Sequence, residues 1–207
     1  MMKDIFKQFS RLLELTLVSP QLILFYLTTS NKFIQADVER WVTIFQWTES
    51  SQLINLLTLI SRNSEFRNLY YHRISKGNFY PKILMKIMKL FYPESPLLFI
   101  DASCNIGQGL FIQHGFSTII MADMGENCWV NQQVSIGYKD NTGRPKIGNN
   151  VRITAGAKVL GNINVGDNVT VGANAVVTKN VPDNCVVIGV PAYIIKRNGL
   201  KVQEKLV

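Results

Sequence analysis

Histidine and cysteine are scarce in this chain of 207 residues, which contains two histidines, His72 and His114, and three cysteines. A metal site that collects three different histidines is therefore excluded, and we expect no metal cofactor. An odd number of cysteines does not make a closed disulfide framework, so we expect free thiols and a reducing compartment, which favours the cytoplasm. Scarcity of these residues leaves very few candidates for nucleophilic or acid–base chemistry.

Long apolar runs are also missing. Residues 12–27 are mostly apolar, but Glu14, Pro20 and Gln21 interrupt the stretch and make it a poor membrane span. The first ten residues lack the apolar region and small-residue cleavage site of a secretion signal. No Gly-rich phosphate loop follows a strand in the first hundred residues, which disfavours a sugar nucleotidyltransferase.

Acidic residues are fewer than basic ones, 14 against 22, and the formal net charge is +8. The sequence shows neither zinc-type cysteine spacing nor a basic recognition helix, so we expect no nucleic-acid partner. Several of the cations gather in residues 197–207. Two interpretations of this basic tail remain open: a solvated, frayed end, or attraction to a polyanion such as a phosphorylated cofactor.

Residues 1–96 have the hydrophobic periodicity of helices. Apolar residues spaced three and four apart predict helices over 6–18, 38–60 and 79–92. The last of these carries Lys82, Lys86 and Lys89 beside an apolar face. Packing against its own domain is the favoured interpretation of that helix, and contact with an anionic membrane surface is the alternative.

From Ile100 onward, an aliphatic residue recurs at every sixth position. The expected inward positions are Ile100, Ile106, Ile112, Thr118, Met124, Val130, Ile136, Ile147, Ile153, Val159, Val165, Val171 and Val177. A second inward column follows four residues later, at Cys104, Leu110, Phe116, Ala122, Cys128, Val134, Val151, Ala157, Ile163, Val169, Ala175 and Val181. A period of six fits neither a helix nor an alternating strand. It fits a solenoid in which three short strands make one coil.

The repeat predicts an α+β chain, mainly β, in which a helical N-terminal domain precedes a parallel β-helix. We expect domains at residues 1–96 and 97–196, followed by the tail at 197–207. Terminal repeats of a solenoid expose unpaired strand edges and need a cover. The helices and residues 181–195, which leave the six-residue phase, are expected to supply that cover.

Three hexads give about eighteen residues per coil, so outward residues align vertically. His114 follows the inward Ile112 by two positions, and adding eighteen places Gln132 above it. Allowing for five inserted residues, the line continues through Ala155 and Ala173. A long, thin ligand fits along such a line with its reactive end beside the imidazole. The alternative is that His114 is merely a polar surface residue.

A neutral imidazole suits general-base catalysis, because an alcohol is too weak an acid to ionise unaided. Gln132 or a backbone N–H is expected to hold the oxyanion that forms when the alcohol attacks a thioester. The inserted loop, residues 138–146, is expected to overhang the groove and contribute to function. A tolerated insertion without function is the alternative.

Three segments carry a family resemblance. They read GLFIQHGFSTIIM, PKIGNNVRITAGAKVLGNINVGDNVTVGANAVVTKNVP and VIGVPAYII, within residues 106–196. This stretch resembles the serine acetyltransferase branch of the hexapeptide-repeat acyltransferases. The resemblance implies a left-handed β-helix, homotrimers, and acetyl-CoA bound between neighbouring subunits. It implies His114 as the catalytic base, Gln132 in the catalytic site, and a coenzyme A groove lined by Gly137, Tyr138, Ala155 and Ala173, with Lys179 near the phosphates.

Two positions depart from the family pattern. Phe99 stands where the family has the carboxylate that orients the histidine, and Asp101, two residues further on, is the candidate substitute. Gly143 and Arg144 stand where the family has an Arg-His pair that binds the serine carboxylate. Arg144 remains the candidate substrate-binding residue, since a guanidinium pairs well with a carboxylate.

Three hypotheses follow. The first is an acetyl-CoA-dependent O-acetyltransferase acting on L-serine. The second keeps the donor and takes a sugar hydroxyl of a surface polysaccharide as acceptor. The third is a non-enzymatic β-helix scaffold, for which His114→Ala is expected to change nothing. The sequence leaves open whether trimers pair into hexamers and whether a product controls the activity.

Overall fold

The computed structural model describes residues 2–47 and 51–206. This part of the chain divides into two compact units, residues 1–95 and 96–207. Six helices make up the first unit: α1 (Met2–Val18), α2 (Gln21–Leu27), α3 (Asn31–Phe45), α4 (Gln52–Arg62), α5 (Ser64–Lys76) and α6 (Phe79–Phe91). No described helix has the length and apolar character needed to cross a bilayer.

The helix predictions are right at 6–18 and 79–92, within a few residues, and wrong for 38–60. That stretch is two helices, because Gln46 adopts a left-handed conformation (φ 53°) and its N–H bonds back to Val42 and Thr43, which ends α3. Ser51 then caps α4 by accepting a hydrogen bond from the Ile54 N–H at 3.3 Å. Residues 48–50, within the same prediction, lie outside the described residues.

The helical unit has its own core. Its largest fully buried side chains include Trp41, Phe66, Tyr70 and Tyr71. Arg73 of α5 is 4% exposed and pairs with Asp37 of α3, 1% exposed, through an Nε–Oδ2 contact of 2.8 Å and an Nη2–Oδ1 contact of 3.2 Å. The two-point geometry satisfies charges that would otherwise be costly to bury.

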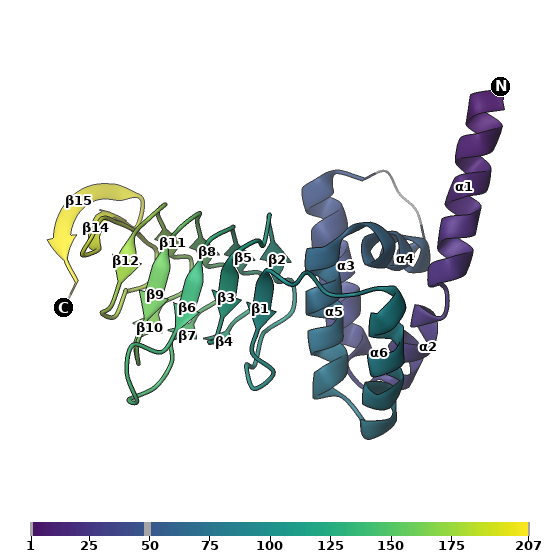
Figure 1. Ribbon diagram of the computed structural model, residues 1–207. Helices are drawn as coiled ribbons and strands as arrows, with labels where there is room; N and C mark the ends of the chain where they lie inside the picture. The colour runs from purple at the N-terminus through teal and green to yellow at the C-terminus, as the bar shows by residue number, and fades with distance from the viewer. Residues whose placement is uncertain (1, 48–50, 207) are drawn as a thin grey trace. The chain divides into compact units, whose positions relative to one another are not determined.

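The second unit is a coil of short parallel strands stacked in three sheets (Figure 1). One sheet, sheet A, has the order β1-β3-β6-β9-β12: Leu98–Ile100, Thr118–Ile120, Ser135–Gly137, Lys158–Leu160 and Val176–Val177. Sheet B has the order β10-β7-β4: Asn164–Val165, Lys146–Ile147 and Asp123–Met124. Sheet C contains β2 (Phe111–Ile112), β5 (Trp129–Val130), β8 (Arg152–Ile153) and β11 (Thr170–Val171).

Sheet C continues into the C-terminal end of the chain. β13 (Cys185–Ile188) pairs in parallel with β11, and β14 (Tyr193–Arg197) and β15 (Leu200–Lys205) then add antiparallel strands. The basic segment is therefore an ordered edge strand in the structure, not a frayed end. Lysines on an exposed edge strand also discourage pairing with another sheet.

The two inward columns are buried over most of their length, and all three cysteines are buried free thiols. Two positions in the predicted columns are wrong. Phe116 is 44% exposed, and Thr118 occupies its place in the second column with no exposed surface. Ile120 instead lies in the first column, in register with Ile136. The cause is a longer corner after β2, described below. Ile100, at the open edge of its sheet, is only half-buried.

Candidate functional site

The corner that carries His114 is two residues longer than the corners above it. β2 pairs with β5 so that Ile112 matches Val130, whereas β3 pairs with β6 so that Ile120 matches Ile136. The chain therefore uses eight residues between these inward positions, where the next coil uses six. The two additional residues have no counterpart in the corner of the next coil, and His114 is one of them.

Backbone hydrogen bonds between coils show where the longer corner differs from the regular ones. In the regular coils the Gly156 N–H donates to the Gln132 carbonyl at 3.0 Å, and the Asn174 N–H donates to the Ala155 carbonyl at 2.9 Å. In the first coil the Gln133 N–H donates to the Phe116 carbonyl at 3.0 Å. The predicted vertical line is thus right for Gln132, Ala155 and Ala173, but Phe116 is the residue stacked beneath them.

His114 is held in a left-handed conformation (φ 52°) and its side chain is exposed. Ser117 (φ 52°) takes the left-handed position that Gln133 and Asn174 take in later coils, so the conformation of His114 is an additional one that belongs to the longer corner. Such conformations cost about 1–3 kcal/mol and concentrate at functional sites. The corner therefore presents the imidazole to solvent, as a base that meets a ligand requires.

Amide and aromatic side chains lie beside this corner. Gln113 Oε1 accepts hydrogen bonds from Trp129 Nε1 at 3.2 Å and from Asn131 Nδ2 at 3.0 Å. The Arg152 guanidinium lies 4.8 Å from the centre of the Trp129 ring. Sequence reasoning missed this set. The signal was present, because Gln113 and Asn131 are eighteen residues apart and so stack on one face of the coil.

Two buried amide oxygens in the same region, Asn131 Oδ1 and Gln132 Oε1, have no hydrogen-bond partner among the described residues. A buried polar atom left unpaired costs about 1–3 kcal/mol. Both atoms are acceptors, so a donor group of a bound molecule suits them. Gln132 therefore offers an amide with an unused acceptor one coil above the His114 corner.

The predicted cofactor residues occupy several positions of the coil. Ala155 is half-buried and Ala173 is exposed, above Gln132 on the stacked corner between sheets C and A. Gly137 ends β6 in sheet A, and Tyr138 follows it with half its side chain exposed. Lys179 Nζ donates to the Leu206 carbonyl at 3.1 Å, and its side chain remains exposed beside a cavity that β12, β14 and β15 enclose.

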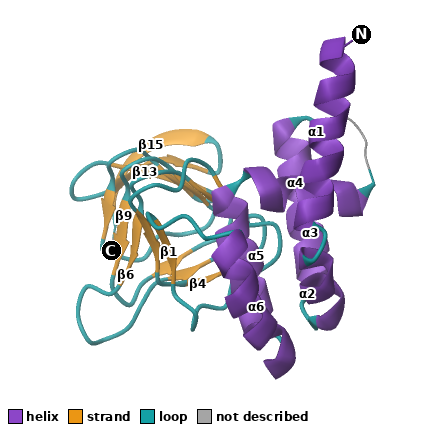
Figure 2. Cartoon of the chain, turned by 45° about the vertical axis from the view of Figure 1, so that its right-hand side comes forward, coloured by secondary structure: helices purple, strands orange, loops and turns teal. Residues whose placement is uncertain are grey.

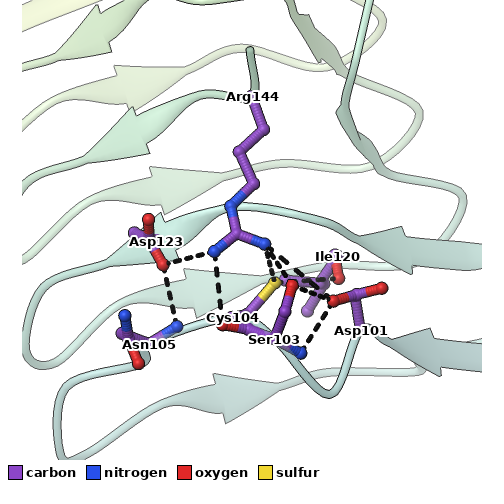
Figure 3. Close-up of polar contacts among 7 residues, drawn as sticks. All are labelled: Asp101, Ser103, Cys104, Asn105, Ile120, Asp123 and Arg144. Atoms are coloured by element: carbon purple, nitrogen blue, oxygen red, sulfur yellow. Dashed lines mark hydrogen bonds and ion pairs between the residues drawn. The ribbon is translucent and has the colours of Figure 1, made fainter.

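Arg144, the candidate substrate-binding residue, is engaged within its own chain (Figure 3). Its Nη2 donates to Asp123 Oδ1 at 2.8 Å, and its Nη1 donates to Ser103 Oγ at 2.6 Å. Asp101 Oδ1 lies 3.9 Å from Nη1. The side chain of Arg144 is 17% exposed. These contacts hold the returning end of the inserted loop against the first two turns of the coil.

The loop itself has local order. Asp140 Oδ1 accepts a hydrogen bond from the Thr142 N–H at 2.9 Å and another from the Thr142 hydroxyl. These bonds hold the pKa of the Asp140 carboxyl below its usual value. Gly143 follows in a conformation (φ 143°) that side chains rarely adopt. The turn brings the chain back to Arg144.

The structure does not gather all the predicted site residues at one corner. His114 lies between sheets C and A, because it follows β2 and precedes β3. Asp101 follows β1, and Arg144 precedes β7, so both lie between sheets A and B. Within one chain, the imidazole and these two charged residues therefore stand at different corners of the coil. Asp101 instead faces Ser103 and Arg144 (Figure 3).

Comparisons with known proteins agree with this architecture. A family profile described as bacterial transferase hexapeptide (six repeats) matches residues 144–179. A serine acetyltransferase of Synechococcus elongatus is 39% identical over 145 residues, which cover 66% of this chain and 59% of the relative. The chain thus spans somewhat over half the length of that relative.

Solved structures extend the likeness to the fold. A Neisseria gonorrhoeae serine acetyltransferase in complex with serine superposes with a TM-score of 0.65 at 25% identity, covering 81% of this chain and 69% of that one. A Brucella abortus serine acetyltransferase in complex with coenzyme A gives 0.60 at 25% identity, covering 81% and 68%. The predicted fold, a helical N-terminal region followed by a left-handed β-helix, is confirmed. In sequence and fold the chain is similar to serine acetyltransferases, and residues 144–179 match the hexapeptide-repeat transferase profile.

Proposed function

We propose that the protein is an acetyl-CoA-dependent O-acetyltransferase and that L-serine is its first candidate acceptor. The observation that carries the proposal is the His114 corner, which presents an exposed imidazole at the foot of the Gln132, Ala155 and Ala173 column. The likeness to serine acetyltransferases, among them structures with serine and with coenzyme A, supports both the donor and the acceptor.

The proposed reaction is a direct transfer. Neutral His114 takes the proton of the acceptor hydroxyl while the oxygen attacks the thioester carbonyl carbon. The carbonyl oxygen becomes an oxyanion, and the Gln132 amide N–H donates to it. Collapse of this adduct breaks the carbon–sulfur bond and releases the coenzyme A thiolate, which receives the proton from the imidazolium. The products are the O-acetyl ester and free coenzyme A.

The remaining residues have roles in binding. Ala155 and Ala173 leave the upper column free of bulky side chains for the pantetheine arm. Gly137 and Tyr138 lie at the opposite end of the sheet A strand, so they contribute to the groove from the neighbouring subunit. Lys179 is our candidate for the phosphates, since its side chain is exposed and its ammonium group donates to the Leu206 carbonyl, not to a carboxylate. Asp101 and Arg144 share one charged cluster, and we propose that the cluster orders the loop and meets the carboxylate of serine.

A homotrimer completes this site. His114 and the 138–146 loop lie at different corners of one chain, so the loop of one subunit meets the histidine of its neighbour only in an assembly. A complementation experiment tests this directly. Mixed trimers of a His114→Ala chain and a chain lacking residues 139–143 should regain acetyl transfer, because one interface in each mixture pairs an intact histidine with an intact loop. Failure to regain activity, with mixed trimers present, contradicts the arrangement.

A sugar hydroxyl is the second candidate acceptor, and two observations favour it. Arg144 already donates to Asp123 and Ser103 within its own chain. The His114 corner is also bordered by uncharged amides and by Trp129, groups that suit hydroxyl-rich ligands. Release of coenzyme A thiol, measured with serine, homoserine and several sugars, separates the two candidates. Turnover on sugars and none on serine keeps the donor and overturns serine.

A further inference from the structure

Helix α6 exposes a continuous apolar face. Its exposed large apolar side chains are Phe79, Tyr80, Ile83, Ile87, Leu90 and Phe91, and four of these are at least 70% exposed. At about 100° per residue they fall within an arc of roughly 120° on the helix. We call these six residues the α6 face. Pro81 and Met85 are buried and hold the opposite side of the helix against the rest of the unit.

Neighbouring helices fix this orientation. α6 packs against α5 and α2 (Figure 2). Its C-terminal end is tied down as well, because the Tyr71 hydroxyl donates to the Tyr92 carbonyl at 2.9 Å. The α6 face therefore lies on the side of the helix opposite the hydrophobic core of the helical unit. A face of this size is uncommon on the surface of a monomer and marks an interaction site.

Lysines border the α6 face along one edge. Lys82 and Lys86 fall on the arc next to Phe79, and the helix contains no acidic residue. Lys89 lies on the same edge but is already paired, with its Nζ 2.7 Å from Glu94 Oε2 and 5.1 Å from the centre of the Tyr71 ring. The free positive charge beside the apolar face therefore comes from Lys82 and Lys86.

We propose that the α6 face binds an anionic membrane surface, with the helix lying in the plane of the interface. A helix of 13 residues is about 20 Å long, which is too short to cross the hydrocarbon core and long enough to rest on it. Apolar and aromatic side chains enter the boundary between headgroups and acyl chains, while lysines meet the lipid phosphates.

Charge decides between this partner and a second copy of the chain. Two α6 faces packed together offer no carboxylate to the lysines that border them, so like charges gather at the edge of the contact. Anionic lipid supplies the missing negative charge. The proposal concerns the helical unit alone and does not depend on which acceptor the β-helix uses.

Co-sedimentation of the full chain with vesicles tests the proposal. The wild type should bind phosphatidylcholine vesicles that contain phosphatidylserine, bind plain phosphatidylcholine vesicles far less, and lose binding in high salt. Lys82→Glu with Lys86→Glu should lower the partition coefficient about tenfold or more, since each lysine near an anionic surface contributes roughly fivefold. Ile83→Asn with Ile87→Asn should lower it by a similar factor, because the apolar term is lost.

Lys32→Glu with Lys201→Glu is the matched control, since it makes the same change in net charge at exposed lysines on α3 and β15. This control should bind as the wild type does, and all variants should keep the thermal unfolding midpoint within a few degrees. Equal binding by wild type and both α6 variants overturns the proposal. A wild type that does not sediment with anionic vesicles also overturns it. A fall in particle mass on Ile83→Asn with Ile87→Asn, without vesicle binding by the wild type, assigns the face to a second copy instead.

Discussion

Ile120 lies in register with Ile136 on the adjacent coil, yet it stands eight residues after Ile112 where the next coil has six between Val130 and Ile136. The two extra residues make the His114 corner. Deleting Gly115 and Phe116 restores the six-residue spacing between Ile112 and Ile120 and leaves Thr118 in the second inward column. We expect this deletion to keep the β-helix, with an unfolding midpoint within a few degrees of the wild type, and to abolish acetyl transfer. Retained activity in the deletion variant would show that the longer corner does not matter.

The Arg73–Asp37 pair is expected to be essential to the helical unit. Both side chains are almost completely buried, so Arg73→Met leaves an unpaired carboxylate inside the core. Removing one partner of a buried pair costs about 3–5 kcal/mol. Chemical denaturation measures the loss. Arg62→Met is the control, because Arg62 is 56% exposed and its loss should cost about 1 kcal/mol or less. Equal losses in the two variants contradict this ranking.

The Glu14–Arg62 pair makes the helical unit sensitive to acid. The Arg62 guanidinium holds the pKa of Glu14 at about 2, below its ordinary value of 4.5. A lowered pKa means that the stabilisation is present above pH 4.5 and is lost as the pH falls towards 2. The wild type should therefore exceed Glu14→Gln in unfolding free energy by about 1 kcal/mol or less at neutral pH. That difference should shrink as the pH falls through about 2, and a difference that stays at its neutral-pH size there is the contrary result.

Burial is expected to protect the cysteines. It raises the pKa of the Cys128 thiol to about 11, and Cys104 and Cys185 are shifted in the same direction by the same cause. At pH 8 a thiol of this pKa has roughly a hundredfold less thiolate than a free cysteine. Iodoacetamide should therefore label Cys128 roughly a hundredfold more slowly in the folded than in the unfolded protein. Cys104 and Cys185 should also react more slowly in the folded protein. Rapid labelling of one thiol in the folded protein contradicts the expected burial.

The sequence predicted the coil well because its signal repeats. Each inward side chain sits in the same environment, so a single period predicts burial across both columns. The period assigned the wrong positions to Phe116 and Thr118. An apolar residue happened to stand at the expected spacing, and only the pairing of β3 with β6 reveals the longer corner.

Contacts between distant residues account for the other misses. Arg73 and Asp37 are 36 residues apart, and Arg144 and Asp123 are 21 apart. Neither pairing leaves a periodic trace. Helix α5 went unpredicted because its buried side includes His72 and Arg73 as well as apolar residues. Polar residues count against burial until their partners are known.

Thiol release from acetyl-CoA by the wild type and by His114→Ala tests the central claim most directly. The account predicts turnover with one of the hydroxyl acceptors and a fall in kcat of about a hundred- to ten-thousandfold in the variant, without a change in the unfolding midpoint or in particle mass. Wild-type activity in a folded His114→Ala chain contradicts the proposed base. Absence of turnover by the wild type with every acceptor points instead to a scaffold.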